Sequence, residues 1–351
     1  MNCNKKSLNL LCWYMPAGTA TPQFLDDYCE AFTEEGHNIT KIDIIEACKN
    51  FERLPVDKWI PYLGSIMNQI KPDFIFSYDY WIFYPFISGN VIYTGPFSQP
   101  ELNEKTISLF EILNIPTFAL FGDDPYWKFG DVDSPNILFK KQLSSATHKS
   151  FLHHKPYVER MISDNFNNVY FMPIALNPKK FYQEELAFNN YLYDVTFAGS
   201  YTEKRGQILR TSVNKFNLTI FGDEGFFNDP VLKKYTHKKV QHGRELADIY
   251  RESKINLNII GNNITTSVGM REFEIWGAGG FLISENCTGL QDVFENDKNF
   301  ITFDSIDDLH EKIEYYLSHP EERIRLIKLN QQKIINEHTY NQRVKKIVEI
   351  L

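Results

Sequence analysis

Residues 267–284 have the sequence SVGMREFEIWGAGGFLIS. The pattern predicts a short helix that begins after small polar residues, ends at glycines and leads directly into an apolar strand. Arg271 and Glu274 are three residues apart, so they share one face of that helix. Thr266 and Ser267 stand where an N-cap is expected, and the free amides of a helix N-terminus can bind an anion. The segment is therefore either an ordinary helix packed on a sheet or part of an anion site.

The size and charge of the chain are those of a globular protein of about two domains. It has 351 residues, of which 43% are hydrophobic and 23% charged, and a net charge of −8. This negative balance argues against a nucleic-acid binder, because such proteins rely on basic contacts to phosphate. No apolar run reaches the length of a membrane span. One basic cluster, which is either a solvated surface or a patch for lipid or phosphate, contains Lys233, Lys234, Lys238 and Lys239.

The cysteines and the N-terminal sequence favour a cytoplasmic protein. The cysteines have no Cys-x-x-Cys spacing and are odd in number, so reduced thiols are the simplest interpretation. They are Cys3, Cys12, Cys29, Cys48 and Cys287. Residues 8–15 imitate the apolar part of a signal peptide, but they contain Asn9 and no small-residue cleavage site follows them. We expect them to form a first buried strand.

Strand-like runs alternate with helical patterns along the chain, which is typical of parallel α/β architecture. In the first half the expected strands are Asn9–Tyr14, Ile39–Ile44, Asp73–Ser77, Val91–Thr94, Thr117–Phe121 and Val169–Met172. The expected helices between them are Pro22–Glu35, Val56–Ile70 and Pro100–Leu113. A polar segment after Pro173 interrupts the alternation.

The alternation resumes after residue 190. The expected strands there are Tyr193–Ala198, Leu218–Phe221, Ile255–Ile260, Phe281–Ser284 and Phe300–Phe303. The expected helices are Glu203–Asn214, Arg244–Ser253 and Val268–Ala278. Capping boxes formed by Ser305 with Asp308, and by Thr339 with Gln342, predict two further helices.

The predicted fold class is α/β, with two doubly wound, Rossmann-like domains facing a cleft and a helical tail at the C-terminus. The domains are expected at residues 1–175 and 190–330, followed by a terminal helix over 331–351 that packs back across them. Ligands favour the carboxyl ends of parallel strands, where helix N-termini converge. Site residues are therefore expected directly after strands.

Residues 198–205 follow the first strand of the second domain and lead into a helix. Gly199 would let the backbone approach a ligand closely, and Arg205 offers a planar guanidinium suited to a pyrophosphate. A glycine turn with an ordinary surface arginine is the alternative. The chain has neither G-x-G-x-x-G nor G-x-x-x-x-G-K-[ST], which disfavours nicotinamide enzymes and P-loop NTPases. Weaker signals of the same kind, equally typical of ordinary turns, are Gly222, His242 and Gly243.

Acidic residues follow two strands of the first domain. Asp123 and Asp124 come directly after the run 117–121. They either cap a helix that begins at Pro125 or contact substrate across the cleft. Asp79, after the strand that ends near residue 77, is a weaker candidate of the same kind.

No pattern in the sequence specifies a metal site. His153 and His154 lie on an expected helix but lack the spacing of a metal pair. Asp131 and Asp133 form the type of Asp-x-Asp pair that can hold Mn²⁺ against a nucleotide diphosphate. Three residues in a polar turn do not specify such a site, so we expect neither a metal nor a cofactor.

The motifs of the second half form a recognisable set. They are Asp194–Ser200 with Arg205, Lys254–Asn258, Arg271–Glu274 followed by Gly277–Gly280, and His338–Tyr340 with Arg343. Together they resemble the CgeB-like group of GT-B glycosyltransferases, a group named after a spore-maturation protein. Tyr170–Ala175 is similar to the interdomain link of that group, and Asp123–Pro125 has a counterpart there. The likeness covers roughly residues 120–351, whereas the first 110 residues fit the fold without being diagnostic.

The resemblance implies an acceptor domain in the first half and a nucleotide-sugar donor domain in the second. It implies that Glu274 holds the donor ribose, and that Arg205 and Arg271 hold the diphosphate together with the amides of Ser267–Gly269. The other predicted donor-binding residues are Gly199, Ser200, Gly222, His242, Gly243 and Thr266. The predicted catalytic residues are Asp79, Asp123 and Asp124. Thr266 stands where many related retaining enzymes have a second glutamate, so the sugar contacts and the stereochemical course stay open.

These observations predict a metal-independent glycosyltransferase that uses a nucleotide-diphosphate sugar as its substrate. The acceptor is expected to be a protein, a cell-surface glycan or a small molecule, and no nucleic-acid partner is expected. A non-catalytic binding or scaffold protein of the same fold and a nucleotide-sugar epimerase are the alternatives. The combination of Glu274, Arg205 and Arg271 favours an enzyme. We expect both arginines to line a solvent-filled cleft.

Overall fold

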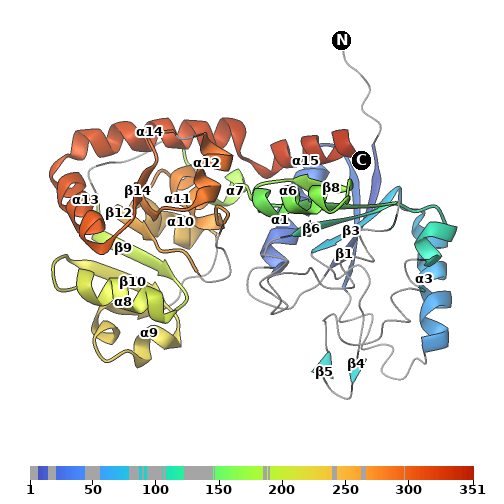
Figure 1. The fold of residues 1–351 in the computed structure, drawn as a ribbon, viewed down its shortest axis with the longest axis horizontal. Helices are drawn as coiled ribbons and strands as arrows, with labels where there is room; N and C mark the ends of the chain where they lie inside the picture. Colours follow the sequence, from blue (N-terminus) through green and yellow to red (C-terminus); the bar gives the residue numbers. More distant parts are fainter. Residues whose placement is uncertain are drawn as a thin grey trace, which may run out of the picture. The chain divides into compact units, whose positions relative to one another are not determined.

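The computed structural model consists of two compact units, one formed by residues 1–173 with 344–351 and the other by residues 174–343. Each unit contains a parallel sheet with helices around it, which confirms the predicted α/β class (Figure 1). The structure describes residues 7–14, 21–43, 56–78, 87–88, 91–92, 105, 108–121, 145, 147–184, 188, 190–238, 243–261, 266–295 and 297–351.

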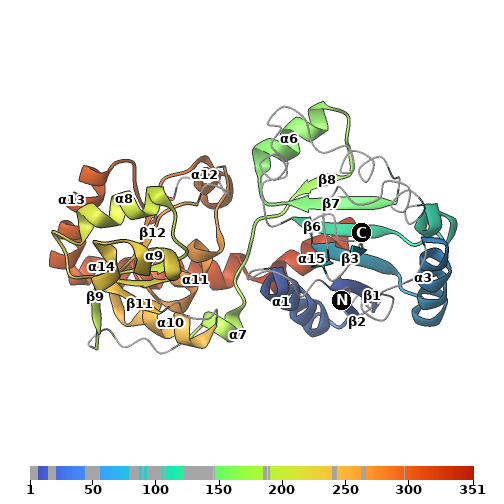
Figure 2. The ribbon, with the colours of Figure 1, turned by 90° about the horizontal axis from the view of Figure 1, so that it is seen from below.

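The first unit is built on a six-stranded parallel sheet with the strand order β2-β1-β3-β6-β7-β8. Figure 2 shows these strands side by side in that order. The strands are β1 (Asn9–Tyr14), β2 (Asn38–Asp43), β3 (Phe74–Tyr78), β6 (Thr117–Phe121), β7 (His148–Leu152) and β8 (Val169–Phe171). The helices are α1 (Thr21–Glu34), α3 (Val56–Ile70) and α6 (Lys155–Ser163), and residues 108–112 are also helical. All five residues of β6 are buried, as expected for a central parallel strand covered on both faces.

Two segments of this unit differ from the sequence-based expectation. The run Val91–Thr94 does not join the large sheet, because β5 (Val91–Ile92) pairs antiparallel with β4 (Ile87–Ser88). The sheet contains β7 instead, which the alternation did not predict because its first residues are polar. His148 of β7 is buried with both ring nitrogens satisfied, since Nδ1 lies 2.7 Å from Thr117 Oγ1 and Nε2 lies 2.9 Å from Ser150 Oγ.

The two neighbouring histidines do not lie on a helix, so that expectation was wrong. His153 follows β7, and His154 is the N-cap residue of α6, which begins at Lys155. Both rings are buried against each other, with centroids 4.1 Å apart. They are buried because they form the short connection between the end of β7 and the start of α6.

The second unit has a six-stranded parallel sheet with the order β11-β10-β9-β12-β13-β14. The strands are β9 (Tyr193–Gly199), β10 (Leu218–Gly222), β11 (Thr236–Lys238), β12 (Ser253–Asn258), β13 (Leu282–Glu285) and β14 (Ile301–Phe303). The helices are α7 (Pro178–Phe181), α8 (Glu203–Ser212), α9 (Glu224–Asn228), the 3₁₀ helix η3 (Leu232–Tyr235), α10 (Arg244–Arg251), α11 (Met270–Ala278), α12 (Thr288–Phe294), α13 (Ile306–Ser318) and α14 (Pro320–Glu337). The strand order reverses between β9 and β12, as in dinucleotide-binding Rossmann sheets.

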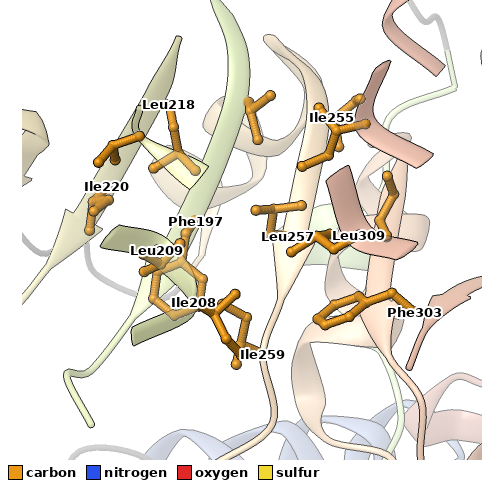
Figure 3. Packing of buried hydrophobic residues seen from close by; sticks show 14 of the residues in the cluster. Phe197, Ile208, Leu209, Leu218, Ile220, Ile255, Leu257, Ile259, Phe303 and Leu309 are labelled. Carbon is orange, nitrogen blue, oxygen red and sulfur yellow. The ribbon is translucent and has the colours of Figure 1, made fainter. Parts of the chain in front are cut away.

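The core of the second unit lies where β9, β10 and β12 meet α8 and α13 (Figure 3). Val195 and Phe197 are two residues apart on β9 and therefore face the same side of the sheet. Both are fully buried, as are Leu209 of α8 and Leu309 of α13. Each such side chain contributes about 1.5–3 kcal/mol when it leaves water. This packing holds α8, which follows the candidate site, against the sheet.

The predicted helix over residues 331–351 is divided between two helices, α14 and α15 (Tyr340–Ile350). At the break, Thr339 forms a β-bridge with Leu176, and Arg343 Nη2 donates to the carbonyl of Ile174 at 3.1 Å. The bridge satisfies backbone groups that a continuous helix would have paired internally, because the amide of Leu176 donates to the carbonyl of His338 at 2.8 Å and the amide of Tyr340 donates to the carbonyl of Leu176 at 3.0 Å. No helix in the described part of the chain is long and apolar enough to cross a membrane.

Candidate functional site

The candidate site lies at the carboxyl edge of the second sheet, around the ends of β9, β10, β12 and β13. Gly199 pairs with Gly222 at the ends of β9 and β10, and Asn258 pairs with Ser284 at the ends of β12 and β13. The strand order reverses between β9 and β12, and this is where open α/β sheets bind ligands. The predicted donor residues that the structure describes gather around this edge.

Gly199 and Arg271 are brought together although they are far apart in the sequence. A Cβ atom on Gly199 would lie 2.7 Å from Nη2 of Arg271, so the guanidinium passes directly over the end of β9. Nε of Arg271 donates to the carbonyl of Ala198 at 2.5 Å. Gly199 therefore lets the Arg271 side chain approach the backbone closely, and its predicted approach to a ligand stays a prediction.

Arg205 is held differently, and the expectation that it lines a solvent-filled cleft was wrong. Only 7% of the surface of Arg205 is exposed. Nε donates to the carbonyl of Ile259 at 2.8 Å, and Nη1 donates to the carbonyl of Ser200 at 2.9 Å. The guanidinium also lies 5.6 Å from the centroid of the Phe197 ring. Arg205 thus links the segments that follow β9 and β12, and it places a positive charge beside them.

The two arginines concentrate positive charge at the sheet edge. Burial, and after it the positive charge of Arg271, lower the pKa of Arg205 to about 10. The charged form of Arg205 is less favourable beside Arg271, because two like charges share a site of reduced dielectric constant. A bound anion would relieve this repulsion.

The N-terminus of α11 adjoins the arginines, but its cap differs from the prediction. The N-cap residue is Gly269, which offers no side-chain hydrogen bond, so Thr266 and Ser267 are not caps. Ser267 is buried, and its backbone is closely covered by Gly289 of α12. The N-cap residue therefore supplies no acceptor for the first amides of α11, and a helix N-terminus of this kind favours a bound anion.

Glu272 in the first turn of α11 was not predicted as a site residue. Its Oε1 accepts hydrogen bonds from Asn258 Nδ2 at 2.8 Å and from Ser284 Oγ at 3.3 Å. Burial raises the pKa of Glu272, and the amides of Glu272 itself and of Gly269 partly oppose this effect. The carboxyl group ties α11 to the ends of β12 and β13. The sequence alone did not indicate this role of Glu272, because its partners lie on other elements.

Glu274 lies on the same helix, one turn after Arg271. It is buried, with 5% of the residue exposed, and the hydroxyl of Tyr250 donates to its Oε2 at 3.5 Å. Burial raises the pKa of Tyr250 well above its ordinary value, and the nearby charge of Glu274 adds to this. Tyr250 is thus held as a neutral donor beside the carboxylate, a role that periodicity alone did not reveal.

The loop after β10 is connected to the loop after β9 through Asp223. Its carboxylate accepts the amide of Tyr201 at 3.0 and 3.2 Å, and it caps α9 by accepting the amide of Gly225 at 3.2 Å. Gly222 leaves room for the Phe226 ring, which a Cβ atom would approach to 2.3 Å. Asp223 had the sequence signal of an N-cap, since it follows a strand and precedes a short helix.

Comparison with known proteins agrees with this architecture. Residues 205–349 match the model of a family described as glycosyl transferase-like. A glycosyltransferase structure from Rickettsia africae is 13% identical with a TM-score of 0.66, and the match covers 99% of this chain and 98% of that chain. Sucrose-phosphate synthase from Thermosynechococcus elongatus is 12% identical with a TM-score of 0.65, and the match covers 98% of both chains.

A third solved structure carries a nucleotide sugar. HepE from Anabaena in complex with UDP-glucose is 10% identical with a TM-score of 0.63, and the match covers 97% of this chain and 99% of that chain. No curated protein matches the chain significantly. The chain has the GT-B fold, which confirms the predicted fold class. The family match over residues 205–349 supports the predicted enzyme class, and the CgeB-like subgroup stays a prediction.

The remaining predicted residues are placed only in part. Gly243 is the N-cap residue of α10 with φ +120°, a conformation that favours glycine. Four predicted residues lie outside the described residues and stay predictions; they are Asp79, Asp123, Asp124 and His242. Asp131 and Asp133, which were not expected to hold a metal, also lie outside the described residues. Among the residues that the structure does describe, no group of three or more His, Cys, Asp or Glu side chains could hold a metal.

Proposed function

We propose that this protein transfers a sugar from a nucleotide-diphosphate sugar to an acceptor, and that the second unit binds the donor. The observation that carries the proposal is the pair of guanidinium groups, Arg205 and Arg271, at the carboxyl edge of a Rossmann-type sheet. They adjoin the N-terminus of α11, whose N-cap residue is Gly269. Both features favour a bound diphosphate, because cations and helix amides stabilise phosphate oxygens.

The same groups offer a way to stabilise the leaving nucleoside diphosphate. As the glycosidic bond to the donor phosphate breaks, negative charge grows on that diphosphate. Fixed positive groups and helix amides stabilise such charge without reorganising during the reaction. We propose that the two arginines supply what a divalent metal supplies in other transferases, and that the nucleotide sugar is a substrate rather than a cofactor.

Glu274 is the proposed partner of the donor ribose. A carboxylate can accept hydrogen bonds from two vicinal hydroxyls, and Tyr250 orients it on α11. The acceptor is proposed to bind the first unit, with Asp79, Asp123 and Asp124 as candidates for contact or proton removal. We also propose that the protein belongs to the CgeB-like subgroup, that it acts in the cytoplasm, and that its acceptor is a protein, a glycan or a small molecule.

A ligand screen tests the proposed function directly. The intact protein is heated with UDP, GDP, CDP or TDP and with their sugars, and the unfolding midpoint is measured. A ligand at 100 times its Kd should add about 2.7 kcal/mol to the free energy of unfolding. Binding to none of these compounds would contradict the proposal. Conversion of the donor with no acceptor present would instead favour an epimerase, and binding without any turnover would favour a scaffold.

A further inference from the structure

The loop from Gly199 to Thr202, between β9 and α8, holds the two arginines through its backbone. Arg271 Nε donates to the carbonyl of Ala198, directly before the loop, at 2.5 Å. Arg205 Nη1 donates to the carbonyl of Ser200 within it at 2.9 Å. A change in the path of this loop therefore moves Arg205 directly, and it reaches Arg271 through the end of β9.

The next residue, Tyr201, has a ring that fits a slot between two glycines. A Cβ atom on Gly206 of α8 would lie 2.9 Å from its hydroxyl oxygen, and one on Gly225 of α9 would lie 2.4 Å from its Cβ atom. The ring also packs edge-to-face on Phe226, with centroids 5.1 Å apart at 81°. A side chain on either glycine would displace the ring, so the slot is shaped for Tyr201.

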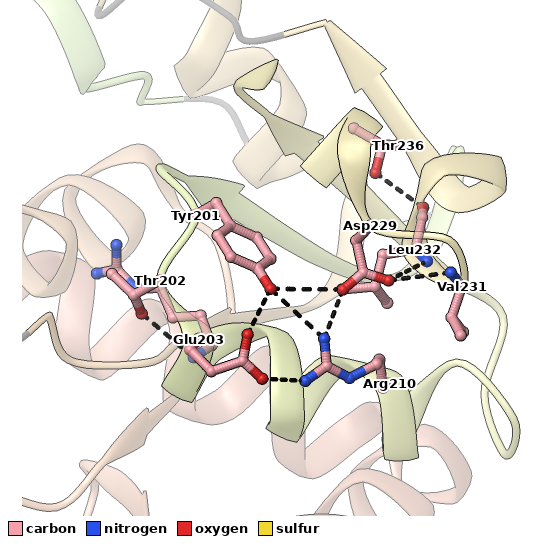
Figure 4. A network of polar contacts seen from close by, with 9 residues as sticks. Tyr201, Thr202, Glu203, Arg210, Asp229, Val231, Leu232 and Thr236 are labelled. Carbon is pink, nitrogen blue, oxygen red and sulfur yellow. Dashed lines mark hydrogen bonds and ion pairs between the residues drawn. The ribbon is translucent and has the colours of Figure 1, made fainter. Parts of the chain in front are cut away.

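The hydroxyl of Tyr201 lies at the centre of a charged network (Figure 4). It donates to Glu203 Oε2 at 2.8 Å and lies 3.5 Å from Asp229 Oδ2. Arg210 contacts all three groups, with Nη1 3.5 Å from the hydroxyl and 2.5 Å from Asp229, and with Nη2 on Glu203. The network therefore links the loop, α8 and the segment after α9.

The network is anchored at its buried end by Asp229. Its side chain is only 2% exposed, and its Oδ1 accepts the amides of Val231 and Leu232 at 3.0 Å each. Burial alone would raise the pKa of Asp229, but these amides and Arg210 lower it overall. An ionised carboxylate is thus fixed to the backbone, which gives Arg210 and Tyr201 a rigid partner.

We propose that Tyr201 is a positioning residue for the diphosphate part of the donor. Its amide is held by Asp223 and its side chain by the slot and the network, so one residue fixes the loop from both backbone and side chain. The carbonyl of Ser200 in that loop holds Arg205, and the carbonyl of Ala198 directly before the loop holds Arg271. This role rests on the proposed function. Tyr201 would affect the binding of the phosphates without contacting them.

The variant Tyr201→Phe tests this role because the ring keeps the slot filled while the hydroxyl is lost. Calorimetric titration uses the nucleoside diphosphate that binds wild type and the matching monophosphate. The loss of one such bond predicts a rise of about threefold to tenfold in the Kd of the diphosphate. The monophosphate, which reaches fewer of the arginine groups, should change less than twofold. In kinetics, kcat/KM for the donor should fall by at least the same factor, because the displaced arginines also stabilise the leaving diphosphate.

Tyr315→Phe is the matched control, because the hydroxyl of Tyr315 also donates to a glutamate, Glu322 Oε2, at 2.8 Å. That bond joins α13 to α14 away from the loop, so its loss should leave both Kd values unchanged. Arg210→Gln should mimic Tyr201→Phe, and the double variant should bind little worse than either one, because both changes break one network.

Three results would count against the positioning role. An unchanged diphosphate Kd in Tyr201→Phe would overturn it, as would equal losses for the diphosphate and the monophosphate. Fully multiplicative effects of Tyr201→Phe and Arg210→Gln would also overturn the network. Wild-type protein that binds no nucleoside diphosphate would overturn the proposed function, and this inference with it.

Discussion

At the scale of single residues, Arg205 and Arg271 carry the same charge but have different environments. Arg205 is buried and donates to two backbone carbonyls, whereas Arg271 is half-buried and passes over Gly199. Arg205→Ala should therefore lower the free energy of unfolding by about 2–4 kcal/mol, because two buried acceptors lose their donor. Arg271→Ala should mainly affect catalysis, lowering kcat/KM about 100-fold to 1000-fold.

Urea denaturation and donor kinetics on both variants check this difference. Arg271→Lys is a useful second variant. It keeps the positive charge but loses the planar guanidinium, which bonds to Ala198 and is proposed to bind the diphosphate. An Arg205→Ala protein as stable as wild type would contradict the structural role, and unchanged kinetics in Arg271→Ala would place the diphosphate elsewhere. The sequence identified both arginines but could not separate them, because Ile259, one partner of Arg205, lies 54 residues away.

At the scale of elements, α12 fixes the segment that leads into α11. A Cβ atom on Gly289 would lie 2.5 Å from Ser267 Cα, and backbone atoms cannot rotate out of the way. Gly289→Ala should therefore cost about 1–3 kcal/mol of stability through overpacking. It should also weaken nucleoside-diphosphate binding, since the segment before α11 must move.

Gly64→Ala provides the control for this substitution. Gly64 lies within α3, where nothing stands within 4 Å of an added Cβ atom. Replacing a helical glycine there should stabilise the protein by about 0.5–1 kcal/mol and leave nucleotide binding unchanged. Thermal unfolding with and without nucleoside diphosphate measures both effects; a Gly289→Ala protein that behaves like Gly64→Ala would disprove the close packing.

The elements that sequence analysis predicted well are those whose signals are local. The Ser305 cap of α13 is present, with its side chain accepting the amide of Asp308 at 3.2 Å, and β1, β6 and α3 have the expected bounds. The start of α11 was misplaced because Thr266 and Ser267 have cap-like chemistry, while tertiary packing places the cap at Gly269. Strand β7 was missed for a similar reason. Its polar residue His148 is buried because it bonds to Thr117 of another strand.

At the scale of the whole molecule, the two-unit fold was predictable because alternating strands and helices allow few arrangements. The candidate site was predictable only where a glycine or arginine follows a strand. Tyr201 and Glu272 escaped notice, because their partners come from α9, β12 and β13. Such contacts depend on the strand order and register, which a single sequence does not contain.

Buried histidines should make the whole molecule sensitive to mild acid. Burial lowers the pKa of His148 to about 3 and that of His154 to about 2, with nearby Lys149 and His153 acting in the same direction. Burial also lowers the pKa of His310 in the second unit. In the unfolded chain a histidine has a pKa of about 6.5, so the unfolded state binds more protons below that value. The free energy of unfolding therefore keeps its full value above about pH 6.5 and decreases as the pH falls toward 3.

The expected loss is about 1.4 kcal/mol for each of His148 and His154 at pH 5.5. Carboxylates with lowered pKa values, such as Asp229, keep their contribution until the pH falls to about 4, so they do not mask the effect. Calorimetry at pH 7 and pH 5.5 should therefore show a lower unfolding midpoint in acid. His148→Gln removes one titrating ring but keeps groups that can bond to Thr117 and Ser150, so its midpoint should fall less between the two pH values. Equal shifts in wild type and variant would mean that His148 is not held neutral in the folded protein.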